Sequence, residues 1–203
     1  MRVCRLPIFM ALAALMAGCA RQPWHPPEPI DNWEQHRRTA TQLESWQISG
    51  KLGLRLPDDN ASARLRWRQE GEEFRIDLSG PLGQGRIVIR SDGRSVRLIQ
   101  SGADPLEAAS ADELVWQATG WLFPASDLLY WVRGIAAPGE DYRIREYTPE
   151  GLLKTLEQDG WTIHFSRYQN SDQLATDLPL PGQLVAEQQD TRLTLIIHQW
   201  KQP

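Results

Sequence analysis

The feature that most constrains the fold of this chain is a repeated alternation of apolar and polar residues with a period of two. Leu65 and Trp67, for example, alternate with Arg64, Arg66 and Arg68. Such alternation is typical of strands that turn one face toward a core and the other toward water. It recurs in segments that span residues 48–56, 61–68, 74–78, 86–90, 95–100, 142–147, 152–158, 161–168, 183–188 and 191–200. The pattern predicts an antiparallel meander of roughly ten strands.

Three segments have the pattern of helices instead. Residues 31–45 gather their apolar side chains near one helical face. Ser110 and Glu113 form a capping box that opens a helix over residues 111–119. A third helix is expected within residues 124–134, between a proline and a glycine. The last two helices are short and strongly apolar, so they need a surface to lie on.

Together these elements predict a strongly curved sheet whose apolar concave face is covered by the helices, with tight turns at Asp92-Gly93 and Asp159-Gly160. A flat sheet would leave too much of the apolar face in water. A wall of roughly 8 to 11 strands can enclose a ligand cavity as well as a core. A wholly filled interior is the commoner outcome for such patterns, and periodicity does not distinguish the two.

Residues 1–18 have the three parts of a lipoprotein signal peptide. Arg2 and Arg5 are cationic, residues 8–16 are apolar, and small residues precede Cys19. The apolar run is too short for a transmembrane helix. Cys19 is therefore predicted to become the first residue of the mature protein and to carry the lipid. Ala20 replaces the aspartate that commonly retains such proteins at the inner membrane, so we expect the outer membrane of a Gram-negative bacterium, facing the periplasm.

Residues 19–30 are expected to form a spacer, because their four prolines favour extended backbone. Residues 31–203 fit a single domain by length. Loss of the signal peptide removes two arginines and no acidic residue, which leaves 20 basic and 26 acidic residues and a net charge of −6. This balance argues against nucleic acid as a partner and predicts no broad cationic surface for anionic lipid. The lipid on Cys19 is expected to provide most of the affinity for the membrane.

Motifs for catalysis and metal binding are missing from the sequence. The four histidines lack the spacing of zinc ligands and are expected at the surface or at sheet edges, and no serine lies in a G-x-S-x-G elbow. The glycine-rich run 80–85 leads into a strand pattern, whereas a phosphate-binding loop opens a helix. Cys4 lies in the removed segment, so no disulfide within the mature chain is expected. We therefore expect no enzyme activity, no metal and no cofactor.

Leu82 is unusually placed, because it lies between Pro81 and Gly83 at the tip of a turn where polar residues are expected. One interpretation is a leucine folded back onto the domain, since single exposed apolar residues are common. The other interpretation is a protruding apolar side chain that contacts a membrane or a lipid-bearing partner. Burial of one leucine contributes about 1.5 to 3 kcal/mol, which biases orientation or insertion but does not anchor a protein.

Several features follow one another along the chain in a fixed order. They are the lipobox before Cys19, the Pro-rich spacer, the Trp33 helix, Trp46-x-x-x-Gly50, Arg64-x-x-Trp67, Ser79-Gly80-Pro81-Leu82-Gly83, Trp131-x-x-Gly134 and the late strands with Trp161 and Trp200. Together they resemble the LolB family of outer-membrane lipoprotein receptors. The resemblance covers nearly the whole chain, and the Pro-Leu-Gly loop is its most distinctive part.

The resemblance implies a mainly β fold with some α, namely an incompletely closed antiparallel β-barrel with helices over its hydrophobic concave face. It also implies a function. Members of this family accept lipoproteins from the periplasmic carrier LolA, hold the acyl chains in an apolar cavity and insert them into the outer membrane. The expected partners are thus the carrier, cargo lipoproteins and outer-membrane phospholipid, and the protein is expected to be a monomer. The family's protruding loop leucine, which serves membrane insertion of the cargo, matches Leu82.

Candidates for the acyl-chain cavity and its lid come from the apolar strand faces and the short helices. They are Leu54, Leu65, Trp67, Phe74, Ile76, Leu128, Trp131, Trp161 and Phe165. The segment from Leu128 to Val132 is expected to move as part of the lid. The competing hypothesis is a scaffold or assembly lipoprotein that binds the edge of a protein and holds no lipid, and a packed interior without a cavity would favour it. An enzyme that uses paired carboxylates has no support in the sequence.

Overall fold

The computed structural model describes residues 31–80, 85–139 and 142–203. In these residues the chain forms three helices and eleven strands. The helices are α1 (Asp31–Gln42), α2 (Ala111–Thr119) and α3 (Leu128–Trp131). The strands are β1 (Ser45–Arg55), β2 (Asn60–Glu70), β3 (Glu73–Ser79), β4 (Ile87–Asp92), β5 (Val96–Gln100), β6 (Leu106–Ala108), β7 (Tyr142–Tyr147), β8 (Leu153–Gln158), β9 (Trp161–Ser166), β10 (Gln183–Gln188) and β11 (Thr191–Lys201).

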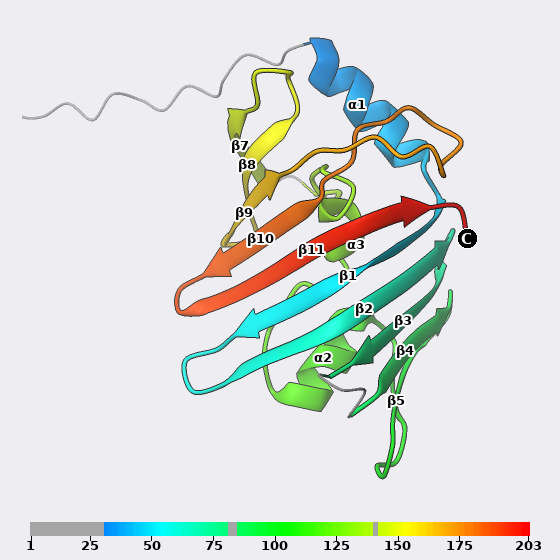
Figure 1. Cartoon of the computed structure of the whole chain (residues 1–203). Helices are drawn as coiled ribbons and strands as arrows, with labels where there is room; N and C mark the ends of the chain where they lie inside the picture. Colours follow the sequence, from blue (N-terminus) through cyan, green and yellow to red (C-terminus); the bar gives the residue numbers. More distant parts are fainter. Residues whose placement is uncertain (1–30, 81–84, 140–141) are drawn as a thin grey trace, which may run out of the picture.

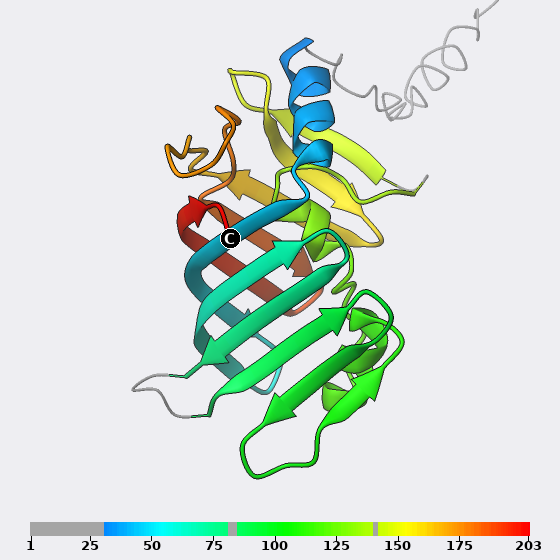
Figure 2. The ribbon, with the colours of Figure 1, turned by 90° about the vertical axis from the view of Figure 1, so that its right-hand side faces the viewer.

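These strands form one antiparallel sheet in the order β6-β5-β4-β3-β2-β1-β11-β10-β9-β8-β7. β1 and β11, the first and last strands, pair with each other at its centre. The end strands β6 and β7 do not pair with each other in the part of the chain described, so the sheet is not closed. Figure 1 shows α2 and α3 behind the sheet and α1 across its upper end, and Figure 2 shows how strongly the sheet bends. The predicted curved, incompletely closed barrel is confirmed.

The period-two alternation produces the two faces of this sheet. In β2, Leu65 and Trp67 are buried, whereas Arg64 and Arg66 are exposed. All ten predicted strands are present. β6 was not predicted, because three residues are too few to display a period of two. The first helix ends before residue 45, where it was expected to end, because β1 already begins there.

The helix signals after residue 109 are confirmed in part. Ser110 Oγ accepts a hydrogen bond from the Glu113 N–H (3.1 Å), and Glu113 Oε2 accepts one from the Ala109 N–H (2.9 Å). Gly120 ends α2 with a left-handed backbone (φ 69°), which glycine adopts without strain. The third helix is shorter than predicted, because only Leu128–Trp131 is α-helical within a longer run of turns.

Tryptophans fill the concave side where the first and last strands meet. Trp46 of β1 packs between Trp67 of β2 and Trp200 of β11, with ring centroids 5.0 and 5.3 Å apart. Trp131 of α3 and Trp161 of β9 are buried in the same cluster. Large aromatic rings therefore join the two halves of the sheet to the segment that covers them.

A buried histidine and a buried arginine fix α1 to the domain. His36 was expected at the surface, but it is 3% exposed, its ring is stacked 6.1 Å from that of Trp33, and its Nε2 lies 3.3 Å from the carbonyl oxygen of Arg133. The expectation was wrong because His36 lies one helical turn after Trp33 and shares its buried face. The Arg133 guanidinium donates to the carbonyl oxygens of Ala40 (2.8 Å) and Leu43 (3.1 Å), at the end of α1.

Asp127, at the start of α3, gives a pH-dependent prediction. Burial, reinforced by the neighbouring Asp159 carboxyl, raises the pKa of Asp127 to about 7. Below about pH 4 the group is protonated in both the folded and the unfolded chain. Between about pH 4 and 7 only the unfolded chain ionises, so the free energy of unfolding falls as the pH rises.

We therefore expect Asp127→Asn to stabilise the protein at pH 8 and to have no effect below pH 4. Because Asp127 is half-buried, we expect the free energy of unfolding at pH 8 to rise by about 1 kcal/mol and the melting temperature by roughly 3 °C. Thermal unfolding of both proteins at a series of pH values measures the difference. Asp104→Asn, which removes an exposed carboxylate, is the control. A gain that stays constant from pH 4 to 8 would mean that ionisation of Asp127 is not its cause.

Candidate functional site

The apolar concave face brings together all nine residues that the sequence proposed for the cavity and its lid. Leu65, Trp67, Trp131, Trp161 and Phe165 are buried in one hydrophobic cluster. The others are partly buried against the same cluster, and they are Leu54, Phe74, Ile76 and Leu128. The nine side chains thus belong to one continuous apolar region. Whether they contact acyl chains stays a prediction.

Part of this face is only half covered, around the turn between β1 and β2. Leu52 and Leu54 of β1 face Ala63 and Ala61 of β2, and Leu78 of β3 lies beyond Leu65. Leu52, Leu54, Ala63 and Leu78 are half-buried and Ala61 is exposed. Two small alanines opposite two leucines leave the leucine side chains incompletely packed. We call these five residues, Leu52, Leu54, Ala61, Ala63 and Leu78, the apolar patch.

The helical cover has a fixed part and an exposed part. Trp131 of α3 is fully buried, and its Nε1 donates a hydrogen bond to Gln158 Oε1 (2.9 Å). By contrast, Trp116 of α2 is 50% exposed and Leu122, just after α2, is 75% exposed. These two side chains are therefore packed less completely than Trp131. The exposed part of the cover is therefore α2 and the residues that follow it.

The apolar patch lies at the end of the sheet where β1 and β3 end and β2 begins. Arg55 at the end of β1 pairs with Asn60 at the start of β2, and Ser79 at the end of β3 pairs with Arg64. The β1–β2 turn and the β3–β4 connection therefore leave the same end of the sheet. Cys19 and Leu82, with Pro81 and Gly83, lie outside the described residues, so their roles stay predictions.

No group of three or more His, Cys, Asp or Glu side chains among the described residues is arranged to hold a metal ion. No helix in that part of the chain is long and apolar enough to cross a membrane.

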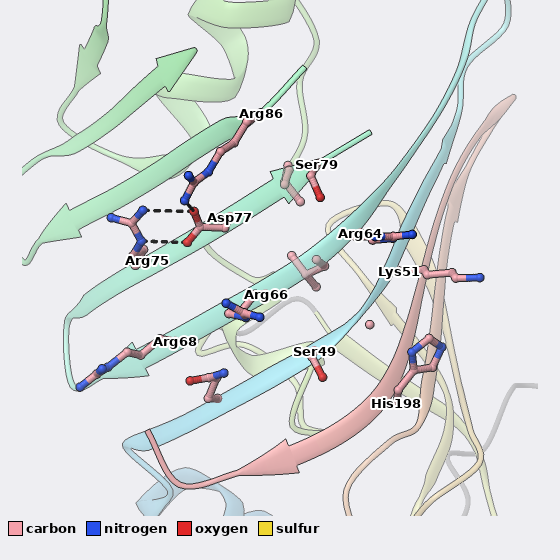
Figure 3. A pocket seen from close by; sticks show the side chains of 14 residues that line it. Ser49, Lys51, Arg64, Arg66, Arg68, Arg75, Asp77, Ser79, Arg86 and His198 are labelled. Carbon is pink, nitrogen blue, oxygen red and sulfur yellow. Dashed lines mark hydrogen bonds and ion pairs between the residues drawn. The ribbon is translucent and has the colours of Figure 1, made fainter. Parts of the chain in front are cut away.

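The opposite, outer face carries a feature that the sequence analysis missed. A groove of about 740 Å³ crosses β1, β2, β3 and β11 and is lined by six cations, Lys51, Arg64, Arg66, Arg68, Arg75 and Arg86, with one carboxylate, Asp77 (Figure 3). The expectation of no broad cationic surface is therefore wrong. Net charge averages over the molecule, whereas strand alternation puts successive arginines on one face. The signal was the spacing Arg64-x-Arg66-x-Arg68.

Known proteins resemble this chain over nearly its full length. The family described as outer membrane lipoprotein LolB matches residues 44–200. An outer-membrane lipoprotein LolB from Cellvibrio japonicus is 43% identical over 199 residues, 97% of each chain. One from Pseudomonas paraeruginosa is 37% identical over 207 residues, again 97% of each. Among solved structures, a LolA superfamily protein from Nitrosomonas europaea has a TM-score of 0.53 at 13% identity, covering 84% of this chain and 93% of its own, which shows a shared fold.

Proposed function

Because the chain belongs to the LolB family of outer-membrane lipoproteins, we propose that it accepts lipoproteins from the periplasmic carrier LolA and inserts them into the outer membrane. The chain is not an enzyme, since this family serves lipoprotein localisation rather than catalysis. In the proposal, the lipid on Cys19 holds the protein at the periplasmic side of the membrane, and the apolar concave face receives the acyl chains of the cargo.

The observation that carries the proposal is the apolar patch. A closed core would bury the side chains of Leu52, Leu54 and Leu78, which are half-buried here. Acyl chains laid on them would complete their packing, and each buried methylene contributes about 0.8 kcal/mol. Transfer then needs no covalent chemistry, because it depends only on differences in affinity among the carrier, this protein and the bilayer.

The cover over the patch must move if acyl chains enter beneath it. The lid was expected at residues 128–132, but Trp131 is held by a buried hydrogen bond, so we now assign it to the fixed wall of the site. We assign the moving part to α2 and the residues up to Phe123, whose ring packs edge-on against Trp161 at 5.2 Å. Trp116 and Leu122, exposed in this state, would contact acyl chains when the cover opens.

The direct test is incubation of the purified protein with carrier that holds a labelled lipoprotein. We expect the label to move onto this protein and then into liposomes. If no label moves, the receptor proposal is wrong, and the competing scaffold hypothesis, binding a protein edge without lipid, takes its place.

A variant within the apolar patch makes this test specific to the site. Ala63→Phe would occupy the space next to Leu52, and displacing about two methylenes of cargo should reduce acceptance roughly tenfold. Ser62→Phe adds the same ring to the exposed outer face and should not reduce acceptance. Equal losses in both variants would show that the patch does not hold the acyl chains.

Leu82 allows acceptance and delivery to be separated. We expect Leu82→Glu to keep acceptance from the carrier but to reduce delivery to liposomes about tenfold or more, because a carboxylate does not enter the bilayer. Gln84→Glu places the same charge two residues away and is the matched control. The labelled lipoprotein is followed in both steps. A loss of acceptance in Leu82→Glu would mean that Leu82 is structural.

A further inference from the structure

We propose that the basic groove on the outer face binds the phosphate groups of anionic phospholipid headgroups, at a site separate from the acyl-chain site. The cations of the groove alternate along the strands with the residues of the apolar patch and so face the other way, although Leu78 of the patch also borders the groove. The inference builds on the proposed function, because the membrane anchor of that proposal keeps the groove near a bilayer.

Positive charge is concentrated in the groove. Six cations and one carboxylate line the groove, although the whole chain has a net charge of −4. Figure 3 shows Arg75 and Arg86 both directed at Asp77. Arg75 Nε lies 2.8 Å and Arg86 Nη2 lies 2.6 Å from its oxygens. The single carboxylate of Asp77 thus pairs with two guanidiniums, and the groove keeps an excess of positive charge.

Like charges face each other across neighbouring strands of the groove. Arg68 of β2 is directly opposite Arg75 of β3, where Glu70 and Asp77 pair with the two guanidiniums and offset the repulsion. Lys51 of β1 is directly opposite Arg64 of β2. Such pairs destabilise a sheet. Lys51, Arg64 and Arg66 form no ion pair within the described residues. An anion bound between these strands would remove the repulsion.

The side chains of the groove favour phosphate as the anion. Five of the six cations are arginines, whose planar guanidinium suits the oxygens of a phosphate. The groove includes Ser79 and Arg86, which flank the connection that carries Leu82. Binding headgroups there would hold that connection at the bilayer surface. A bilayer that already holds the anchor supplies the headgroups at high effective concentration, and this favours a lipid over a free acidic protein.

The lysines of the chain provide the test. Only three are present, at positions 51, 154 and 201. Lys51 lines the groove, whereas Lys154 lies on β8 and pairs with Glu146 (2.6 Å). The lipidated full chain is reconstituted into phosphatidylcholine vesicles with or without phosphatidylglycerol, and lysine acetylation is followed by mass spectrometry. We expect phosphatidylglycerol to slow acetylation of Lys51 about fivefold and to leave Lys154 unchanged.

The expected protection should disappear in 0.5 M salt and in the double variant Arg64→Gln/Arg66→Gln. Arg38→Gln/Arg94→Gln, which removes the same charge from exposed residues outside the groove, should keep it. Equal protection in both kinds of vesicle, or none, overturns the proposal. Protection of Lys51 in phosphatidylcholine vesicles by inorganic phosphate or by polyglutamate, but not by phosphatidylglycerol, would also overturn it, in favour of a free anion or an acidic protein.

Lipoprotein transfer is measured with the same vesicles. Failure of the receptor proposal would appear as no transfer by the wild-type protein, whatever the lipid. Failure of the groove proposal would instead appear as unchanged Lys51 acetylation while transfer remains intact. The two outcomes are therefore distinguishable.

Discussion

Replacing Gly50 with alanine is expected to destabilise the protein by about 3 kcal/mol or more. A Cβ atom at this position would lie 1.9 Å from the carbonyl oxygen of Ile196 and 3.0 Å from its carbonyl carbon. Both are backbone atoms of β11, so no side-chain rotation relieves the overlap. β1 and β11 would have to separate where the register between them shifts. Because this pairing joins the two halves of the sheet, we expect a melting temperature about 10 °C lower.

Gly53→Ala is the matched control for this substitution. Gly53 lies on the same strand, but a Cβ atom there would have its nearest neighbour, the Thr194 carbonyl oxygen, at 3.9 Å. This substitution should be neutral or slightly stabilising, since alanine loses less backbone entropy than glycine. Thermal unfolding of both variants measures the difference. Similar losses in the two would show that the close approach at Gly50 is not what requires glycine.

The sequence predicted the fold well because its strongest signal is local. Residues two apart, such as Leu65 and Trp67, report which side of a strand faces the core without knowledge of its partners. The capping box at Ser110 is equally local. The same reasoning gathered the candidate cavity residues into one region, because all of them were chosen from apolar strand faces and apolar helices.

Features that depend on pairing between distant segments were not predictable in this way. The close approach of Gly50 to β11 and the placement of Lys51 beside Arg64 follow from strand register. Register is not visible in a single alternating run. Similarly, nothing near Arg133 in the sequence indicates that its guanidinium reaches the end of α1, more than ninety residues earlier in the chain.

Arg133 is buried without forming an ion pair within the described residues. Its side chain donates hydrogen bonds to four carbonyl oxygens, those of Ala40, Thr41, Leu43 and Leu129. The end of a helix concentrates partial negative charge on carbonyl groups that lack partners within the helix. The end of α1 therefore takes the place of a carboxylate, and the guanidinium in turn ties α1 to the segment that contains α3.

We expect Arg133→Met to lower the free energy of unfolding by about 3 kcal/mol. We also expect α1 to detach before the sheet unfolds. Methionine fills similar space but removes the guanidinium donor from the part-buried carbonyl oxygen of Leu43 and leaves the Ala40 oxygen with only the Leu43 N–H as its donor. Hydrogen exchange should therefore accelerate first in residues 31–43. Arg133→Lys keeps the charge but not the planar set of donors, so it should recover less than half of the loss. Arg37→Met, which removes an exposed arginine paired with Glu34, should cost less than about 1 kcal/mol. Uniform acceleration across the sheet would show that Arg133 stabilises the core in general rather than holding α1.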